Sequence, residues 1–191
     1  MSKARIGVLA LQGDFAEHKI ALEHAGAQAV EVRLADQLAS LDGLIIPGGE
    51  STTLRKLADA FGLMEPLRAF TQEHPTWGTC AGAIFLAREI EGQEAHLGVM
   101  DITVRRNAFG RQIDSFVTPL NIMGDTYSYP AVFIRAPLIT SVGSSVKVLA
   151  RLNDGQIVAA QQGHLLATSF HPELTNDLYF HRAFLAMVDP R

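Results

Sequence analysis

Residues 43–61 read GLIIPGGESTTLRKLADAF, in which an apolar run stops at a Pro-Gly-Gly turn and a helical pattern follows directly. Gly43 to Ile46 has the length and composition of a strand that is buried on both faces. Ser51 to Phe61 carries its apolar residues at helical spacing. A buried strand joined by a glycine-rich turn to a helix is the unit of parallel sheets with helices on both faces. The segment therefore predicts an α/β fold.

The same alternation extends outward from this segment in both directions. Before it we expect a strand, a helix, a second strand and a short helical turn, and after it a helix, a strand and a further helix. This order predicts a doubly wound, mostly parallel sheet flanked by helices. The expected segments are Ile6 to Leu11, Phe15 to Ala25, Ala29 to Val32, Gln37 to Leu41, Met64 to Gln72, Pro75 to Thr79 and Ala83 to Ile90.

The second half of the chain is rich in strand patterns. Asn153-Asp154-Gly155 separates two of these runs and predicts a tight hairpin, because these residue types tolerate positive φ. No repeat or linker divides the halves, so residues 1–191 are expected to form a single domain with an antiparallel strand extension. The expected strands are Val99 to Val104, Ser115 to Leu120, Ala131 to Ile134, Val146 to Leu152, Gln156 to Ala160 and Leu165 to Phe170, and Phe180 to Val188 predicts a closing helix.

Composition excludes several classes of protein. Of the 191 residues, 48% are hydrophobic and 19% charged, which is typical of a chain with a sizeable core. The formal net charge of −4 offers no basic field for nucleic acid. No window reaches the roughly 18 apolar residues that a membrane span needs, and the N-terminal apolar run is too short for a secretory signal. The single cysteine excludes an internal disulfide, and we expect a reducing, cytoplasmic location.

Gly78-Thr79-Cys80-Ala81-Gly82 stands where a predicted strand meets a predicted helix. A nucleophile between two glycines at such a junction has the form of a nucleophile elbow. The glycines permit a sharp turn that presents the Cys80 thiol at the top of the sheet, and the positive end of the helix dipole favours the thiolate. The alternative is a glycine-rich helix entry in which the thiol is only packed.

His171-Pro172-Glu173 follows the last predicted strand. The residue before a proline favours extended geometry, and residues i and i+2 of an extended chain share a face. The Glu173 carboxylate is therefore expected beside the His171 ring, where it would fix the tautomer and stabilise the imidazolium. The alternative is that these three residues only end the strand.

The turn at Pro47-Gly48-Gly49 ends a strand and opens a helix beginning near Ser51. Its glycines allow backbone N–H groups to point into the cleft beyond the carboxyl ends of the strands, where sites of doubly wound sheets lie. A phosphate site is the alternative, but the P-loop lysine is absent and Glu50 would repel an anion.

Together, these segments resemble the class I glutamine amidotransferases, which release ammonia from glutamine. More narrowly, the chain is similar to the family of glutaminase subunits of pyridoxal 5'-phosphate synthase (PdxT/SNO family). Ile84 stands where many other class I members carry Gln, and Ala108 where this family commonly has Ser. The resemblance rests on Leu11-Gln12-Gly13 with Glu17-His18, Pro47 to Thr53 (PGGESTT), Gly78 to Gly82 (GTCAG), Arg106 to Gln112 (RNAFGRQ), Phe133 to Pro137 (FIRAP) and Ser169 to Leu174 (SFHPEL).

The resemblance implies a flavodoxin-like fold and a Cys-His-Glu triad. Cys80 would be the nucleophile, His171 the general acid/base and Glu173 its orienting partner. It also implies a barrel-shaped synthase subunit as partner, with the segment Leu11 to His18 at the interface and no cofactor. Gly49 and Ala81 would supply the N–H groups of the oxyanion hole, and the glutamine site would be formed by Gly49, Glu50, Ser51, Arg106, Ile134 and Arg135.

The leading hypothesis is a glutaminase that passes ammonia to the synthase for pyridoxal 5'-phosphate (vitamin B6) biosynthesis. One alternative is a free-standing cysteine hydrolase of similar fold that acts on γ-glutamyl or peptide substrates; Arg106 and Arg135 favour free glutamine, whose α-carboxylate an arginine can pair with. The other is a non-catalytic regulatory subunit, which the intact triad disfavours. The remaining histidines show no ligand spacing, so no metal is assigned.

Overall fold

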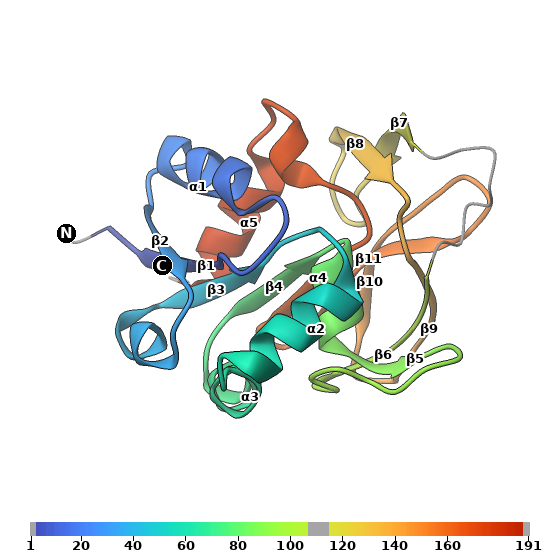
Figure 1. Ribbon diagram of the computed structural model, residues 1–191. Helices are drawn as coiled ribbons and strands as arrows, with labels where there is room; N and C mark the ends of the chain where they lie inside the picture. Colours follow the sequence, from blue (N-terminus) through green and yellow to red (C-terminus); the bar gives the residue numbers. More distant parts are fainter. Residues whose placement is uncertain (1–2, 107–114, 189–191) are drawn as a thin grey trace.

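The computed structural model describes residues 3–106 and 115–188. Within these residues, ten strands form one mixed sheet in the order β2-β1-β3-β4-β12-β11-β9-β6-β5, with β10 paired to β11, and β7 and β8 form a separate two-stranded sheet. Helices cover both faces of the parallel part (Figure 1). The α/β class with a mostly parallel first half and an antiparallel second half is therefore confirmed.

The parallel part contains the strands of the first half together with β12. Strands β1 (Arg5–Leu9), β2 (Gln28–Val32), β3 (Gly43–Ile46), β4 (Thr76–Thr79) and β12 (Leu165–Thr168) pair in parallel with their neighbours in the order given above. Their connections are α1 (Phe15–His24), η1 (Ala35–Ser40), α2 (Ser51–Ala60), α3 (Met64–Glu73) and α4 (Ala81–Leu86), and α5 (Tyr179–Val188) closes the described chain.

The antiparallel part extends the sheet beyond β12. Strand β11 (Ile157–Gln162) runs antiparallel to β12 and to β10 (Lys147–Arg151), and the expected hairpin at Asn153 to Gly155 joins β10 to β11. Beyond β11 lie β9 (Leu138–Val142), β6 (Met100–Arg105) and β5 (Ala87–Ile90). The hairpin of β7 (Ser115–Asn121) and β8 (Ser128–Ile134) pairs along seven residues of each strand.

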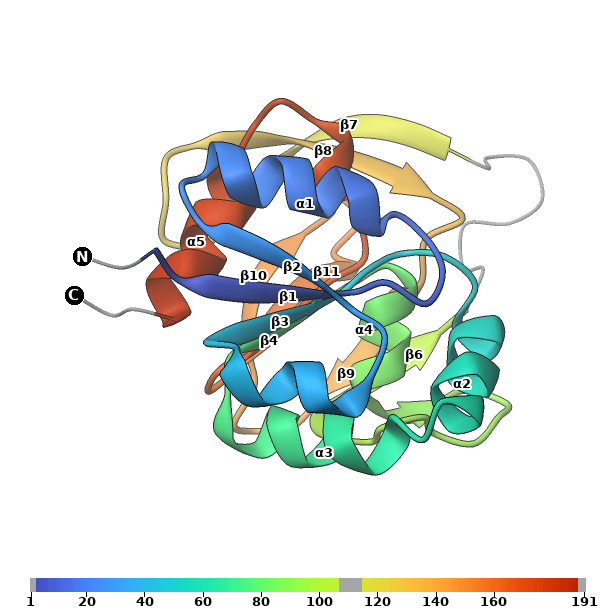
Figure 2. The same cartoon turned by 60° about the vertical axis from the view of Figure 1, so that its left-hand side comes forward.

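Two hydrophobic cores lie on opposite faces of the sheet, as Figure 2 shows for the helices. On one face, Leu44 and Ile46 of β3 belong to the same buried cluster as residues of α2, α3 and α4. On the other, Ile45 of β3 and Trp77 of β4 belong to a cluster with residues of α1 and α5. Because successive side chains of a strand point to opposite faces, the continuous apolar run of β3 supplies both cores.

Two sequence predictions of secondary structure are wrong. Ala83 to Ile90 was expected to be one helix, but the helix spans Ala81–Leu86 and Ala87–Ile90 is strand β5, which pairs with β6. Strand β9 (Leu138–Val142) was not predicted. Ala87–Ile90 is a short segment at which pairing with β6 outweighs local preference, which periodicity cannot detect, whereas the β-branched residues of Leu138–Val142 are compatible with a strand that the sequence reading overlooked.

The carboxyl ends of β3, β4 and β12 meet at one edge of the sheet because these strands are adjacent and parallel. The turns after them carry Gly49, Cys80 and His171, as expected for a site in a doubly wound fold. None of the described helices is long and apolar enough to cross a membrane.

Candidate active site

Cys80 occupies a sharp turn between β4 and α4. Its backbone has φ 49° and ψ −106°, which is disfavoured for a residue with a side chain. The turn is crowded, since a Cβ atom on Gly78 would lie 2.4 Å from the carbonyl oxygen of Gly82, and one on Gly82 would lie 1.9 Å from that of Ile46. Only glycine fits at both positions, so the Gly-x-Cys-x-Gly pattern is required for the nucleophile elbow expected from the sequence.

His171 follows β12 and contacts Glu173 across a single residue. Its backbone N–H donates to the carbonyl oxygen of Val132 in β8 at 2.8 Å. Its Nδ1 atom lies 2.6 Å from Oε1 of Glu173, as the spacing predicted. The extended backbone expected between them is wrong, because Pro172–Leu174 forms a 3₁₀ turn, η2, that brings the carboxylate back to the ring.

Burial and charge act in opposite directions on this pair. Burial alone lowers the pKa of His171, but hydrogen bonds to Asp14, Cys80 and Glu173 outweigh it and raise this pKa to about 12. Burial likewise raises the pKa of Glu173, but the nearby His18 ring and the hydrogen bond from His171 lower it below its ordinary value. The pair is therefore held as imidazolium and carboxylate.

The loop after β3 approaches the same point. Gly49 has φ +144°, and a Cβ atom there would lie 2.6 Å from the side-chain amide of Gln12. That amide accepts from the backbone N–H of Glu50 at 3.0 Å. Glu50 in turn caps α2 by accepting from the N–H groups of Thr52 at 3.1 Å and Thr53 at 2.7 Å, bonds that lower its pKa to about 2 against the opposing effect of burial.

A cavity of about 560 Å³ opens between these loops. It brings together all of the site residues expected from the sequence except Glu173, which is buried behind His171. Those lining it are Gly49, Glu50, Ser51, Cys80, Ala81, Arg106, Ile134, Arg135 and His171.

The two arginines of the cavity differ in their contacts. The guanidinium of Arg106 donates to Glu50 Oε1 at 2.8 Å, to Gln93 Oε1 at 3.1 Å and to Thr52 Oγ1 at 3.2 Å. Arg135 is exposed, has φ 44°, and forms no ion pair with the residues that the structure describes. The remainder of the expected segment after Arg106, residues 107–112, lies outside the described residues.

Ile134, at the end of β8, lies next to the nucleophile candidate. Its carbonyl oxygen accepts from the Cys80 thiol at 3.9 Å. Ser51 contributes a buried hydroxyl oxygen that has no hydrogen-bond partner in the structure. Such an oxygen in a cavity wall is available to a ligand.

Sequence reasoning missed four further residues that line the cavity, namely Gln12, Asp14, Ile84 and Leu174. Asp14 Oδ2 lies 3.4 Å from Nδ1 of His171. Gln12 and Leu174 stand inside the segments used for the resemblance, so their position there was the available signal. The expectation that His18 lies at a partner interface is wrong, because this side chain is completely buried and contacts Glu173.

Asp14, His171 and Glu173 are the group of potential metal ligands that the described residues bring within 4.8 Å of one another. The Nδ1 atom of His171 faces both carboxylates, so the contacts are those of a charged histidine held between two acids. They give no separate indication of a metal or a cofactor.

Comparison with known proteins agrees with this geometry. The model of the "SNO glutamine amidotransferase family" matches residues 8–189. The chain belongs to this family. As a glutamine amidotransferase it is an enzyme, as the sequence motifs predicted.

Individual relatives are similar over nearly their whole length. "Pyridoxal 5'-phosphate synthase subunit PdxT" of Dehalococcoides mccartyi is 56% identical over 189 residues, covering 96% of this chain and 97% of that protein. The protein of the same name from Niallia circulans is 58% identical over 186 residues, with 96% and 97% covered. A solved structure described as a glutamine amidotransferase superposes with a TM-score of 0.90 at 51% identity, covering 96% of this chain and 98% of that one.

Proposed function

We propose that residues 1–191 form one glutamine amidotransferase domain that hydrolyses L-glutamine to L-glutamate and ammonia. The ammonia passes to a synthase subunit that makes pyridoxal 5'-phosphate. The observation that carries the proposal is the shared cavity, in which Cys80 and His171 meet at the ends of adjacent parallel strands, with Glu173 held against His171 from behind. The names of both relatives as subunits of pyridoxal 5'-phosphate synthase support the pathway.

In the proposed reaction, the Cys80 thiolate attacks the side-chain amide carbon of glutamine. His171, charged through its contacts with Glu173 and Asp14, gives a proton to the departing ammonia. A glutamyl thioester remains. His171 then takes a proton from water, which attacks the thioester and releases glutamate and the thiolate.

Each tetrahedral intermediate carries an oxyanion, which Gly49 and Ala81 would stabilise through their backbone N–H groups. Ala81 is the first residue of α4, so its N–H has no acceptor within the helix. Neither N–H is hydrogen-bonded in the described part of the chain. Two unsatisfied donors beside the nucleophile support this role.

The glutamine would lie along the remaining cavity wall. Arg135 has a guanidinium without an ion-pair partner in the described part of the chain and can receive the α-carboxylate. The carboxylate of Glu50 and the hydroxyl of Ser51 can accept from the α-ammonium, with Arg106 holding Glu50 in place. Ile134 lies against the side-chain amide, beside Cys80.

The test is a glutaminase assay of the purified chain, with and without the synthase subunit from the same source. Ammonia release that requires glutamine and Cys80, and that rises when the synthase is added, supports the proposal. Hydrolysis of γ-glutamyl peptides with glutamine left intact would contradict the substrate. Activity that does not respond to the synthase would contradict the partnership.

A further inference from the structure

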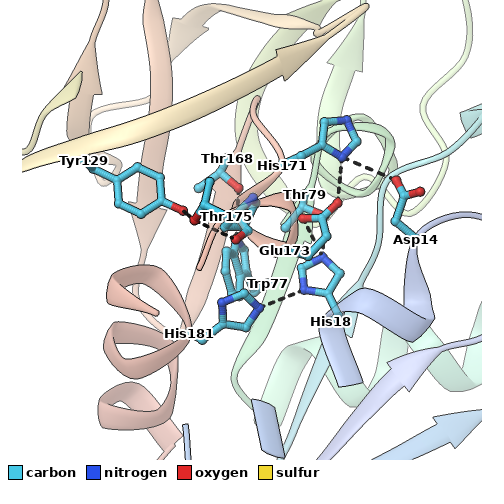
Figure 3. A network of polar contacts seen from close by, with 11 residues as sticks. Asp14, His18, Trp77, Thr79, Tyr129, Thr168, His171, Glu173, Thr175 and His181 are labelled. Carbon is cyan, nitrogen blue, oxygen red and sulfur yellow. Dashed lines mark hydrogen bonds and ion pairs between the residues drawn. The ribbon is translucent and has the colours of Figure 1, made fainter. Parts of the chain in front are cut away.

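Two buried histidines lie behind the proposed triad, and the reaction described above does not use them. His18 of α1 and His181 of α5 have no exposed surface. Figure 3 shows that they continue the line of contacts from His171 through Glu173 into the core between the two helices. A buried polar side chain costs free energy unless its hydrogen bonds are made, so the partners of these rings decide what they do.

The contacts form a continuous line from His181 in the core to His171 at the proposed site. His181 Nε2 lies 3.1 Å from His18 Nδ1. The other ring nitrogen of His18, Nε2, lies 3.2 Å from Glu173 Oε2 and 3.1 Å from Thr79 Oγ1. Glu173 Oε1 contacts His171 at 2.6 Å. The Glu173 carboxylate is thus held between two imidazole rings, one at each oxygen.

The positions of the ring protons of His18 and His181 can be assigned from a ring nitrogen that has no partner among the residues described. His181 Nδ1 is buried and makes no hydrogen bond with the residues that the structure describes. Burial lowers the pKa of His181 to about 3, so its ring is neutral and carries one proton. A buried N–H without an acceptor is costly, so that proton lies on Nε2, where it is donated to His18 Nδ1.

This assignment fixes the orientation of the next ring. Since His18 Nδ1 accepts from His181, the proton of His18 lies on Nε2, which faces Thr79 and Glu173. The reverse tautomer would place a bare nitrogen lone pair 3.2 Å from a carboxylate oxygen. In this structure the Nε2–H of His18 is aligned with the hydroxyl of Thr79, whereas Glu173 Oε2 has no hydrogen-bond partner among the residues described and faces Nε2 as an ion-pair contact at 3.2 Å.

We propose that His18 is a positioning residue for Glu173, that its Nε2–H holds Oε2 so that Oε1 stays on His171, and that His181 selects this tautomer of His18. The proposal rests on the catalytic role proposed above for Cys80, His171 and Glu173. It also gives a physical reason for the buried His18 ring at the position where the motif resemblance implied a docking surface.

Two substitutions of His18 separate donation to Glu173 from mere filling of space. The amide nitrogen of glutamine reaches about as far as Nε2 of histidine, whereas that of asparagine reaches only about as far as Nδ1. In assays with the synthase subunit present, H18N is expected to lower kcat by at least about tenfold with little change in KM. H18Q restores the donor and is expected to remain within about threefold of the wild type.

The matched control is F184L. Phe184 is completely buried and its ring lies 5.7 Å from that of Trp77, in the same core, but it has no polar contact with this chain of histidines. F184L is expected to lower the thermal unfolding midpoint and leave kcat unchanged. If H18N keeps the wild-type kcat, or if H18N and H18Q lose activity in proportion to their unfolding midpoints, the positioning role is refuted.

A measurement on the wild-type chain requires no variant to fold. Nitrogen-15 NMR of labelled histidine distinguishes a protonated ring nitrogen from a bare one. The expected spectrum has the proton on Nε2 of both His181 and His18, and protons on both ring nitrogens of His171. A bare Nε2 on His18 would overturn the proposal. C80A separates the two hypotheses, because an active C80A refutes the proposed function, whereas an inactive C80A beside a fully active H18N refutes only the positioning role.

Discussion

His171 Nδ1 lies 2.6 Å from Glu173 Oε1, and only Pro172 separates the two residues in the chain. Pro172 is the first residue of the turn η2, and the fixed φ of proline sets the path of the backbone between His171 and Glu173. Both side chains are buried, so the contact is shielded from water and the two groups cannot exchange it for solvent. The Glu173 carboxylate that contacts His171 is therefore part of a short, rigid loop rather than a distant element.

The charge of Glu173 should matter more than its shape. E173Q keeps the size of the side chain but offers His171 a neutral amide, so the imidazolium is less stabilised. We expect kcat to fall by about a hundredfold or more, and by less than in H171N, which lacks the proton-transfer group altogether. Steady-state glutaminase kinetics of both variants check this. Equal losses, or wild-type activity of E173Q, would remove the orienting role.

The strained backbone of Cys80 predicts a difference in stability between two inactive variants. Both C80A and C80G lack the thiol, so ammonia release should fall by at least about a thousandfold in each. Glycine accepts φ 49° and ψ −106° without strain, whereas alanine does not. C80G should therefore be more stable than C80A by about 1–3 kcal/mol, measured by urea unfolding. A less stable C80G would mean that the elbow stores no strain.

The shifted pKa values predict how stability depends on pH. Because the pKa of His171 is raised from 6.5 to about 12, its contribution is full below pH 6.5 and is lost as pH rises through that window. The lowered pKa of Glu173 acts oppositely, with a contribution present above its ordinary 4.5 and lost in acid. In C80A the contributions of Cys80 to this shift are gone, but the hydrogen bonds to Asp14 and Glu173 still raise the pKa of His171. C80A should therefore lose unfolding free energy above pH 6.5, at most about 1.4 kcal/mol per pH unit from this one group. The double variant C80A/H171N also lacks the thiol, and it lacks the imidazole as well. Its unfolding free energy should therefore fall less than that of C80A over the same pH range.

Replacement of the two cavity arginines by alanine should change KM and kcat in different ways. Arg135 forms no ion pair within residues 3–106 and 115–188, so R135A should raise KM for glutamine by about tenfold or more and leave kcat nearly unchanged. Arg106 binds Glu50, so R106A should raise KM and also lower kcat by loosening the Gly49 loop. R135K is the control, since it keeps the charge but not the fork of donors. Unchanged KM in both alanine variants would show that the cavity does not bind glutamine through these residues.

Activation by the synthase should depend on the exposed start of α1. Ala16 is exposed there, in the segment that resembles the family's interface, so A16E should weaken activation without changing the basal rate. A60E, which places the same charge on an exposed alanine of α2, is the control. Titration of the synthase into each variant measures the effect. Equal activation of A16E and the wild type would exclude this surface.

Most of the fold, and the proximity of the residues proposed as the triad, could be predicted from the sequence because they depend on local patterns. The apolar run at Gly43 to Ile46 needs two covered faces, and the glycines around Cys80 are needed because nothing larger fits the turn. The proximity of His171 and Glu173 followed from their spacing, although the backbone between them is a 3₁₀ turn and not an extended strand. These features depend on residues close together in the chain.

Only the tertiary structure decided what lies far apart in sequence. Ala87–Ile90 has no local signal against a helix and becomes a strand because β6 offers it a hydrogen-bonding edge. His18 has the sequence appearance of a surface residue next to Glu17, yet it lies 163 residues from its partner His181 and is completely buried. Its contact with His181 exists because α1 and α5 pack on the same face of the sheet, and its contact with Glu173 exists because η2 lies against α1. Local sequence specifies turns and the hydrophobic periodicity of helices and strands. The partners of a buried polar group are instead set by which elements pack on the same face of the sheet.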